Sequence, residues 1–388
     1  MSTSALYPLL ILLSVGSIHT VTAKENAPPA ALNKHFEKAV TSDTVPGINV
    51  AVADKNGLVW AKGYGYADLE NQVAMTPQHK MRIGSVAKVI TAAALMRMVE
   101  QGTVELDKPI TDYLPDWPAK HPAITLRQLT SHTAGIRHYK AGANEFLLNQ
   151  PFDTMQSSLA LFQQDDLSFA PGSAFAYSTF GWTVVSAVME SATMAAADDQ
   201  RRFGQIIQQE VFSPLSMHDS ALDDQYAIIA HRQRPYSVYE GKLYNSPQTD
   251  HSYKWAGGGM IASPADVSRF AVAHLNGEYL STESVKMLFS KATLNDGQAV
   301  EYGVGWNIGF NNYRHRDAYR QNPEIQHMMA AMPNAVMHSG GSMGGITMLI
   351  LCTDHQRAVT VVKNVDGDES ADVFLLALTT LSAYHQQH

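Results

Sequence analysis

The sequence predicts an α/β fold of the α+β type, in which a five-stranded antiparallel sheet flanked by helices is interrupted by a mainly helical insertion. Two observations support this fold class. Apolar, β-branched runs gather near the two ends of the chain, whereas residues 103–254 carry Pro, Gly and short helical patterns with little strand signal. Strands from both ends would then complete one sheet around a shared core. We therefore expect a sheet subdomain (about 35–102 and 255–388) and a helical subdomain (about 103–254).

Five segments are the expected strands. Gly47–Ala53 and Leu58–Tyr64 are apolar, β-branched runs on either side of Lys55-Asn56-Gly57, and Asn-Gly between such runs is typical of a β-hairpin. Three further runs, linked by tight turns, lie near the C-terminus at residues 335–338, 345–352 and 358–363. Apolar residues at helical spacing predict helices at 156–163, 181–192, 200–211 and 373–384.

The first 23 residues resemble a secretory signal peptide. A short apolar core is followed by small residues up to Ala23, which predicts cleavage after Ala23 and a periplasmic or secreted mature chain of residues 24–388. No Lys or Arg precedes the core, so an uncleaved anchor is the alternative, but the run is short for a span of about 20 residues. No Cys lies near the cleavage site to carry a lipid, and we expect no stable membrane anchor after cleavage.

Composition argues against several classes of protein. The 388 residues carry a net charge of −8 and no long basic run, so nucleic acid is not an expected partner. The single cysteine, Cys352, lies in an apolar run and is expected to be a buried hydrophobic residue. The 16 His residues show no metal-binding spacing, so we predict no metal and no cofactor. The oligomeric state stays open.

Ser85-Val86-Ala87-Lys88 is the candidate catalytic motif. It opens a segment rich in Ala, Leu and Met, with apolar residues at helical spacing as far as Gly102. Residues i and i+3 of a helix share a face, so Lys88 can act as a base for Ser85. The helix dipole favours negative charge near Ser85, and with burial it lowers the pKa of Lys88. A Ser N-cap followed by a surface Lys is the alternative, but this helix is too apolar for a surface helix.

Two further segments offer the groups that a Ser–Lys pair needs. Tyr177 follows a Pro-Gly turn and precedes a helix, so it is expected to project from a loop as a second proton carrier. A packing aromatic is the alternative for Tyr177. Met337–Gly345 is a strand end followed by glycines, whose backbone N–H groups can approach a substrate and form an oxyanion hole.

This order of motifs resembles that of serine β-lactamases and penicillin-binding proteins. Within them the chain is similar to the class C-related serine hydrolases, which include esterases, D-amino peptidases and the mitochondrial β-lactamase-like protease. The resemblance covers about residues 35–385. It rests on Ser85–Lys88, Tyr177–Thr179 and His338–Gly341, with further matching blocks at Ile124–Gly135, Val211–Met217, Ala256–Ser263 and Tyr302–Trp306.

The resemblance implies a β-lactamase/transpeptidase-like fold and a role for each matched residue. Ser85 would be the acylated nucleophile, Lys88 would take or relay its proton, and Tyr177 would share the base role and protonate the leaving group. His338 would orient Tyr177 or a substrate carboxylate. The N–H groups of Ser85 and Gly341 would form the oxyanion hole. The remaining substrate-binding residues would be Thr179, Ser339 and Gly340.

Two residues depart from the usual motifs. Thr179 stands in place of the Asn of Tyr-x-Asn, so a hydroxyl is kept but an amide is lost. The mitochondrial protease-like branch also has Tyr-Ser-Thr. His338 stands where many relatives have Lys, and its charge is expected to vary near neutral pH. Both departures point away from efficient β-lactam hydrolysis.

Two other features need an interpretation. Residues 311–334 form a long connection before the third motif, for which we expect either a solvated loop or a substrate-selecting flap. Gly340–Gly344 fits Gly-x-Ser-x-Gly, the nucleophile elbow of α/β-hydrolases, but that elbow requires a following helix. The next run, 346–352, is β-branched and predicts a strand, so we reject this match.

The sequence therefore predicts an exported serine hydrolase that forms an acyl-enzyme with a small-molecule or peptide substrate, as a carboxylesterase or a peptidase. Weak β-lactamase activity is left open. The alternative is a non-catalytic penicillin- or cell-wall-peptide-binding protein on the same fold. Intact Ser85, Lys88 and Tyr177 argue against that alternative, because a binding protein needs no proton relay.

Overall fold

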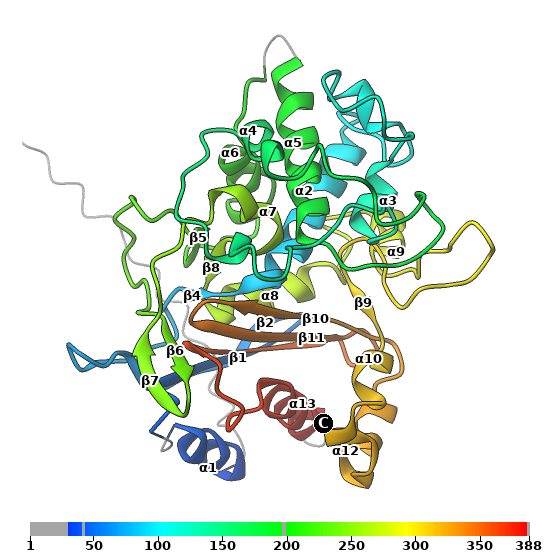
Figure 1. Ribbon diagram of the computed structural model, residues 1–388. Coiled ribbons are helices and arrows are strands. Elements are labelled where there is room, and N and C mark those ends of the chain that lie inside the picture. Colours follow the sequence, from blue (N-terminus) through cyan, green and yellow to red (C-terminus); the bar gives the residue numbers. More distant parts are fainter. Residues whose placement is uncertain (1–29, 41–42, 196–198, 386–388) are drawn as a thin grey trace, which may run out of the picture.

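The computed structural model describes residues 30–40, 43–195 and 199–385. Its central feature is a seven-stranded antiparallel sheet in the order β3-β2-β1-β12-β11-β10-β9 (Figure 1). The predicted signal peptide, with its cleavage site after Ala23, lies outside the described residues. The five predicted strands form the middle of the sheet: β1 (Gly47–Asp54), β2 (Gly57–Asp68), β10 (Ala335–Ser342), β11 (Gly345–Cys352) and β12 (Arg357–Lys363).

The sheet has seven strands rather than the five predicted. The two additional strands, β3 (Val73–Ala74) and β9 (Asn307–Ile308), lie at its edges. Two residues are too few to show an alternating pattern, so neither strand could be predicted from the sequence. The fold class is as predicted.

Strands β1 and β12 join the two ends of the chain. Val50 pairs with Val361, and the antiparallel register continues along both strands. All seven residues of β12 are buried, as expected for a central strand covered on both faces. The predicted hairpin between β1 and β2 is confirmed, with Gly57 at φ +121° in its turn, a backbone conformation that favours glycine.

Helices cover both faces of the sheet (Figure 1). One core holds the helices from near the chain ends, α1 (Ala30–Ala39), α12 (Pro323–Ala330) and α13 (Val373–His385). The larger core lies on the opposite face, where α8 packs on the sheet and two longer helices lie beyond it. These three are α2 (Ala87–Glu100), α5 (Thr179–Ala195) and α8 (Pro264–Ala273).

Short elements complete the chain between these long helices. The segment 103–254 carries three short strands that the sequence did not reveal, β5 (Ser220–Leu222), β6 (Tyr236–Tyr239) and β7 (Lys242–Asn245). The helix predicted at 200–211 is divided into α6 (Phe203–Ile207) and a π-helical turn at Gln208–Phe212. The other short elements are α3 (Leu126–Thr130), α4 (Met155–Ser158), α7 (Trp255–Gly258), α9 (Thr282–Leu288), β4 (Met81–Arg82), β8 (Met260–Ala262) and β13 (Val365–Asp366).

Residues 311–334 do not form the solvated loop that was one of the two expectations. They form α10 (Asn311–Arg314), α11 (Asp317–Arg320) and α12. The rings of Tyr313 and Tyr319 lie 4.1 and 5.0 Å from the ring of Phe374 on α13, measured between centroids. These aromatic side chains thus join the segment to the core that α1 and α13 share on this face of the sheet. A flap role for it stays a prediction.

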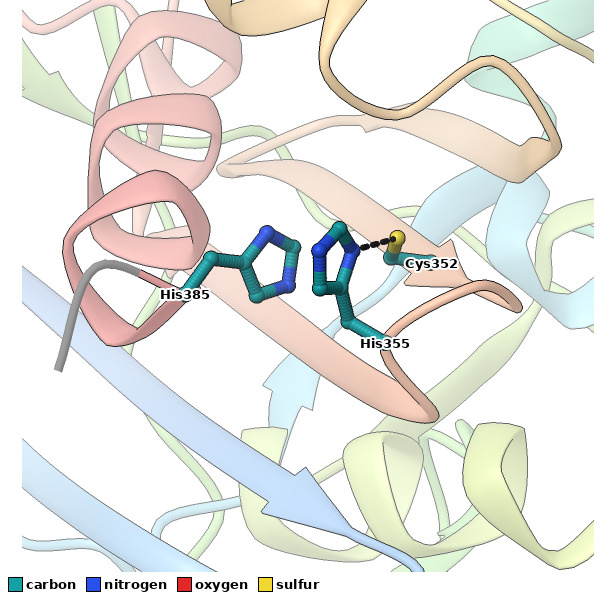
Figure 2. A group of neighbouring side chains, drawn as sticks. All are labelled: Cys352, His355 and His385. Carbon is teal, nitrogen blue, oxygen red and sulfur yellow. Dashed lines mark hydrogen bonds between the residues drawn. The ribbon is translucent and has the colours of Figure 1, made fainter. Parts of the chain in front are cut away.

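The turn after β11 is built around Cys352. This side chain is fully buried, as predicted, and its Sγ lies 3.1 Å from Nδ1 of His355 (Figure 2). The rings of His355 and His385 stack with centroids 3.8 Å apart and planes 20° apart. The potential ligand atoms of the three residues lie within 4.8 Å of one another. The stacked rings pack the end of α13 against the turn.

The segment that fits the nucleophile elbow is a tight turn between two strands. Strand β10 ends at Ser342 and β11 begins at Gly345, which confirms that a strand, not a helix, follows. Within the described ranges, no helix is long and apolar enough to cross a membrane.

Candidate active site

Ser85 and Lys88 lie together at the start of α2. Ser85 is in a 3-10 turn, η1 (Gly84–Val86), so the α-helix itself begins two residues later than the motif. Lys88 Nζ lies 3.1 Å from Ser85 Oγ. Lys88 is fully buried, as are all residues of α2 from 87 to 96. This burial excludes the alternative of a surface lysine.

Lys88 is placed to be a neutral amine. Burial, reinforced by the charge of Lys254, lowers the pKa of Lys88 well below its usual value. Its Nζ contacts the carbonyl oxygen of Gly257 and, at 3.3 Å, Oγ1 of Thr179. A neutral amine has two hydrogens, which these two oxygens can accept. Its lone pair is then left for the hydroxyl proton of Ser85.

A chain of hydroxyl groups fixes the orientation of Thr179. Tyr253 Oη donates to the carbonyl oxygen of Glu145 at 2.7 Å, and that carbonyl can only accept. Tyr253 therefore accepts from Tyr139, and Tyr139 in turn accepts from Thr179. The hydroxyl proton of Thr179 is thus turned away from Lys88. Thr179 replaces the usual Asn with an acceptor that is held in one orientation.

Tyr177 lies in the loop before α5, as predicted. Its hydroxyl shares a hydrogen bond with the side chain of Ser85, and Lys88 Nζ lies 4.8 Å from the centre of its ring. Burial raises the pKa of Tyr177, although the bond to Ser85 opposes this. A phenol that stays protonated is suited to donate a proton rather than to accept one. This environment favours Lys88 over Tyr177 as the base.

His338 lies behind the site and is not the variable charge that the sequence suggested. It is 1% exposed, and burial together with the charge of Lys88 lowers its pKa to about 3, so it is neutral near pH 7. Its Nδ1 lies 2.6 Å from the carbonyl oxygen of Ser339, so Nδ1 carries the proton and Nε2 accepts from Tyr302 Oη at 2.7 Å. His338 makes no direct hydrogen bond with Tyr177. The centroids of these two rings are 6.3 Å apart, and any orienting effect would be indirect.

The glycines around the third motif allow two backbones to touch. A Cβ on Gly340 would lie 1.9 Å from the carbonyl oxygen of Ile83, and one on Gly84 would lie 2.6 Å from the backbone nitrogen of Gly341. Gly84 also has φ +50°. Only glycines permit β10 to approach η1 this closely, and this contact brings the backbones of Ser85 and Gly341 to the same site.

The site opens into a small cavity of about 130 Å³. Four residues predicted from the sequence line it, namely Ser85, Tyr177, Thr179 and Gly341. Lys88, His338, Ser339 and Gly340 are not part of its lining, and the exposed Ser339 shares a hydrogen bond with Tyr313 instead. The other lining residues were not predicted as site residues: His138, Tyr139, Phe146, Lys254, Gly257 and Gly258.

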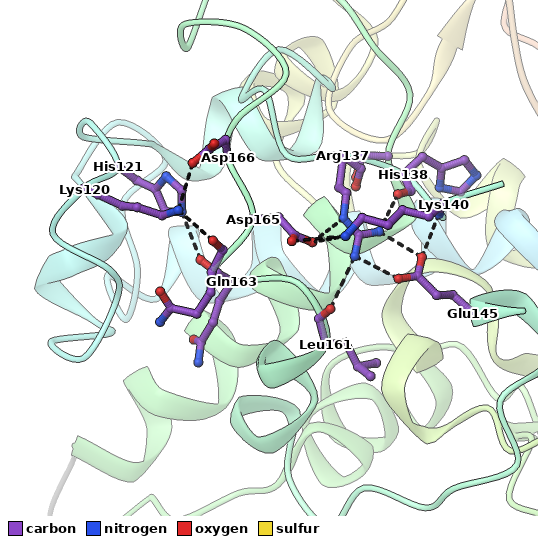
Figure 3. A network of polar contacts seen from close by, with 12 residues as sticks. Lys120, His121, Arg137, His138, Lys140, Glu145, Leu161, Gln163, Asp165 and Asp166 are labelled. Carbon is purple, nitrogen blue, oxygen red and sulfur yellow. Dashed lines mark hydrogen bonds and ion pairs between the residues drawn. The ribbon is translucent and has the colours of Figure 1, made fainter. Parts of the chain in front are cut away.

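A partly exposed ion-pair network supports the loop that carries three of these residues, His138, Tyr139 and Phe146 (Figure 3). Arg137 Nη2 lies 2.8 Å from Glu145 Oε1, and its Nε lies 2.5 Å from Asp165 Oδ2. Lys140 joins the same Asp165 at 3.1 Å. The loop is therefore closed on itself, and His138 accepts a hydrogen bond from the backbone N–H of Thr179.

The fold and site together define a class of protein, the serine hydrolases built on the β-lactamase fold. A sequence model of the Beta-lactamase family matches residues 32–382. The chain belongs to this family.

Several characterised proteins are similar in sequence. The mitochondrial serine beta-lactamase-like protein LACTB of Mus musculus is 28% identical, over 87% of this chain and 76% of its own. Penicillin-binding protein 4* of Bacillus subtilis is 23% identical over 84% and 70%. Esterase EstB of Burkholderia gladioli is 29% identical over 54% and 56%. The family relatives thus include esterases and penicillin-binding proteins.

Solved structures share the fold. The D-amino acid amidase of Ochrobactrum anthropi matches with a TM-score of 0.71 and 21% identity, over 92% of this chain and 98% of its own. The octameric penicillin-binding protein homologue of Pyrococcus abyssi matches with a TM-score of 0.72 and 20% identity, over 92% and 77%. At these identities the likeness establishes the fold.

Proposed function

We propose that this protein is an exported serine hydrolase that cleaves an ester, amide or peptide bond through an acyl-enzyme on Ser85. The contact at 3.1 Å between Nζ of the fully buried Lys88 and Oγ of Ser85, which lines the cavity, carries the proposal. A lysine whose pKa is lowered by burial can accept a proton near neutral pH, which an exposed lysine cannot.

Acylation follows from the directions of the hydrogen bonds. The Ser85 hydroxyl gives its proton to the lone pair of Lys88 while Oγ forms a bond to the substrate carbonyl carbon. The carbonyl oxygen becomes an oxyanion, which the backbone N–H groups of Ser85 and Gly341 are proposed to stabilise. Such a donor is typically worth about 3 kcal/mol in the transition state.

Breakdown of this intermediate releases the leaving group. The bond to the leaving atom breaks, and Tyr177, as the protonated hydroxyl beside Ser85, supplies the proton to that atom. The proton on Lys88 then restores the Tyr177 hydroxyl. Water then attacks the acyl carbon and gives its proton to Lys88. Lys88 passes that proton to Ser85 Oγ as the bond between Oγ and the acyl carbon breaks, which releases the acid and restores Ser85.

Two relatives are described as an esterase and an amidase, which favours esters and amides as the substrates of this chain. The esterase and the D-amino acid amidase share the family or the fold with this chain. Thr179 in place of Asn and a neutral His338 are consistent with weak or absent β-lactamase activity. Export rests on the predicted signal peptide.

A kinetic assay tests the proposal. Wild-type protein and Ser85→Ala are compared on p-nitrophenyl acetate, a D-amino acid p-nitroanilide and nitrocefin. We expect hydrolysis of the ester or the anilide by wild type only, with nitrocefin the slowest substrate. Equal rates for the two proteins on every substrate would refute the proposal and leave the non-catalytic binding protein as the better description.

A further inference from the structure

Four lysines are buried within the part of the chain that the structure describes, and two of them have an ion-pair partner. Lys80 pairs with Asp219 at 2.9 Å, and Lys363 pairs with Asp368 at 3.1 Å. The other two, Lys88 and Lys254, have no carboxylate oxygen within 4.0 Å among the described residues. Lys88 is the proposed base of the reaction, whereas Lys254 takes no part in the proposed proton transfers.

Lys254 is 2% exposed, and it lines the same cavity as Ser85. Its Nζ donates to the carbonyl oxygen of Phe146 at 3.4 Å and lies 4.1 Å from the centre of the Phe146 ring. The Tyr253 ring is 5.2 Å away. An ammonium group has three hydrogens to donate. Within the described ranges only this one long hydrogen bond is made, so donor capacity remains for a ligand in the cavity.

The two acidic residues whose charges act on Lys254, Asp223 and Asp250, are already engaged with other groups. Asp223 is held by Arg82 at 2.8 Å and by Arg232 at 3.1 Å, and Asp250 accepts from Gln225 at 2.9 Å. Arg82 adds further positive charge, and burial lowers the pKa of Lys254 to about 7. A buried cation without a counter-ion is costly. An anion that enters the cavity would remove that cost.

We propose that Lys254 is the specificity-determining residue of this site and that it binds a carboxylate carried by the substrate. The inference rests on the proposed hydrolase function and adds the substrate class, an acidic ester or amide. The cavity of about 130 Å³ has room for a short acidic chain beside the reacting carbonyl. The aromatic rings of Phe146 and Tyr253 would exclude water and so strengthen the ion pair.

Matched substrates that differ only in one charge test the inference. For the acyl side, the monoethyl esters of succinate, glutarate and adipate are each compared with the ester in which the free carboxylate is a carboxamide. For the leaving-group side, the butyryl ester of glycolate is compared with that of glycolamide. We expect wild type to prefer the acidic member of at least one pair by about tenfold to a hundredfold in kcat/KM, as for a hydrogen bond between charged groups.

Variants then assign that preference to Lys254. Lys254→Met removes the charge at similar length, and the acid-to-amide ratio of kcat/KM is expected to fall to about one. Lys254→Arg keeps a charge and should retain part of the preference. Lys55→Met is the matched control, because Lys55 is exposed in the turn between β1 and β2 and does not line the cavity; its ratio should equal that of wild type. If Lys254→Met does not fold, the acid-to-amide ratio of Lys254→Gln is compared with that of wild type instead, and an unchanged ratio overturns the inference.

Failure of the inference can be told apart from failure of the hydrolase proposal. If wild type hydrolyses the neutral esters but shows no acidic preference in any pair, the inference is wrong and the hydrolase proposal stands. A preference that persists unchanged in Lys254→Met also overturns it. If wild type hydrolyses none of these esters and forms no acyl adduct, both proposals fail.

Discussion

Replacement of Lys88 by Met separates a catalytic lysine from a structural one. The substitution keeps the length of the side chain and removes Nζ, which lies 3.1 Å from Ser85 Oγ. Loss of a general base typically lowers the rate by a factor of about 10²–10⁴, equivalent to about 3–5 kcal/mol of transition-state stabilisation. We expect a fall of this size in kcat/KM for an ester substrate.

The stability of the same variant should not fall in parallel. The buried carbonyl of Gly257 loses its partner, at a cost of about 1–3 kcal/mol. Against this, wild type must deprotonate Lys88 on folding because burial lowers its pKa. That penalty is present at low pH and disappears as pH rises toward the unfolded pKa of about 10.4. Lys88→Met lacks the penalty, so its melting temperature at pH 7 should be close to that of wild type.

Two further variants complete this test. Lys88→Arg keeps a positive charge but cannot deprotonate, so it should be as inactive as Lys88→Met. Lys55→Met, a change at an exposed lysine in the turn between β1 and β2, should keep wild-type kinetics. If Lys88→Met or Lys88→Arg retains kcat/KM within about tenfold of wild type, Lys88 is not the base.

Three other substitutions have defined outcomes. Gly340→Ala should lower kcat/KM by about 10²–10³, because its Cβ would lie 1.9 Å from the Ile83 carbonyl oxygen and would push β10 away from the proposed oxyanion hole. Gly341→Ala should lose much less activity, because its Cβ meets nothing closer than 3.9 Å. Equal losses in the two variants would contradict this geometry. Thr179→Val should lower kcat/KM about tenfold to a hundredfold, because it removes the hydrogen-bond acceptor for Lys88. Thr179→Ser should keep most of the wild-type kcat/KM, and equal values for Thr179→Val and wild type would show that the hydroxyl is not needed. Lys254→Met should be more stable than wild type at pH 7 and below, because a folded-state pKa of about 7 lowers the free energy of unfolding of wild type there. Urea denaturation should show that the difference in unfolding free energy shrinks between pH 7 and 10. A difference that stays constant over this range would contradict a buried, unpaired ammonium group.

The parts of the site that are local in sequence could be predicted. Ser85 and Lys88 are three residues apart, so the helical period alone brings them together. The five long strands also carried their own pattern, whereas β3 and β9 are two residues long and depend on neighbouring strands. Tyr177 was found because a turn and a helix start mark its position.

The remaining parts depend on tertiary contacts and could not be predicted. Lys254 lies in the run Tyr253-Lys254-Trp255 just before the glycine-rich block that the family resemblance singled out, but nothing local shows that its side chain is buried without a carboxylate. The neutral state of His338 likewise follows from burial and from Lys88, which is 250 residues away in the chain. Burial of charge is set by packing, and a sequence pattern does not report it.

The acyl-enzyme itself gives the most direct test of the central claim. Protein is mixed with an ester substrate, quenched in acid during turnover and measured by intact-protein and peptide mass spectrometry. We predict a mass increase equal to one acyl group on the peptide that contains Ser85, and no increase for Ser85→Ala. An unmodified Ser85 in a protein that is turning over the ester, or an adduct that persists in Ser85→Ala, would contradict the account.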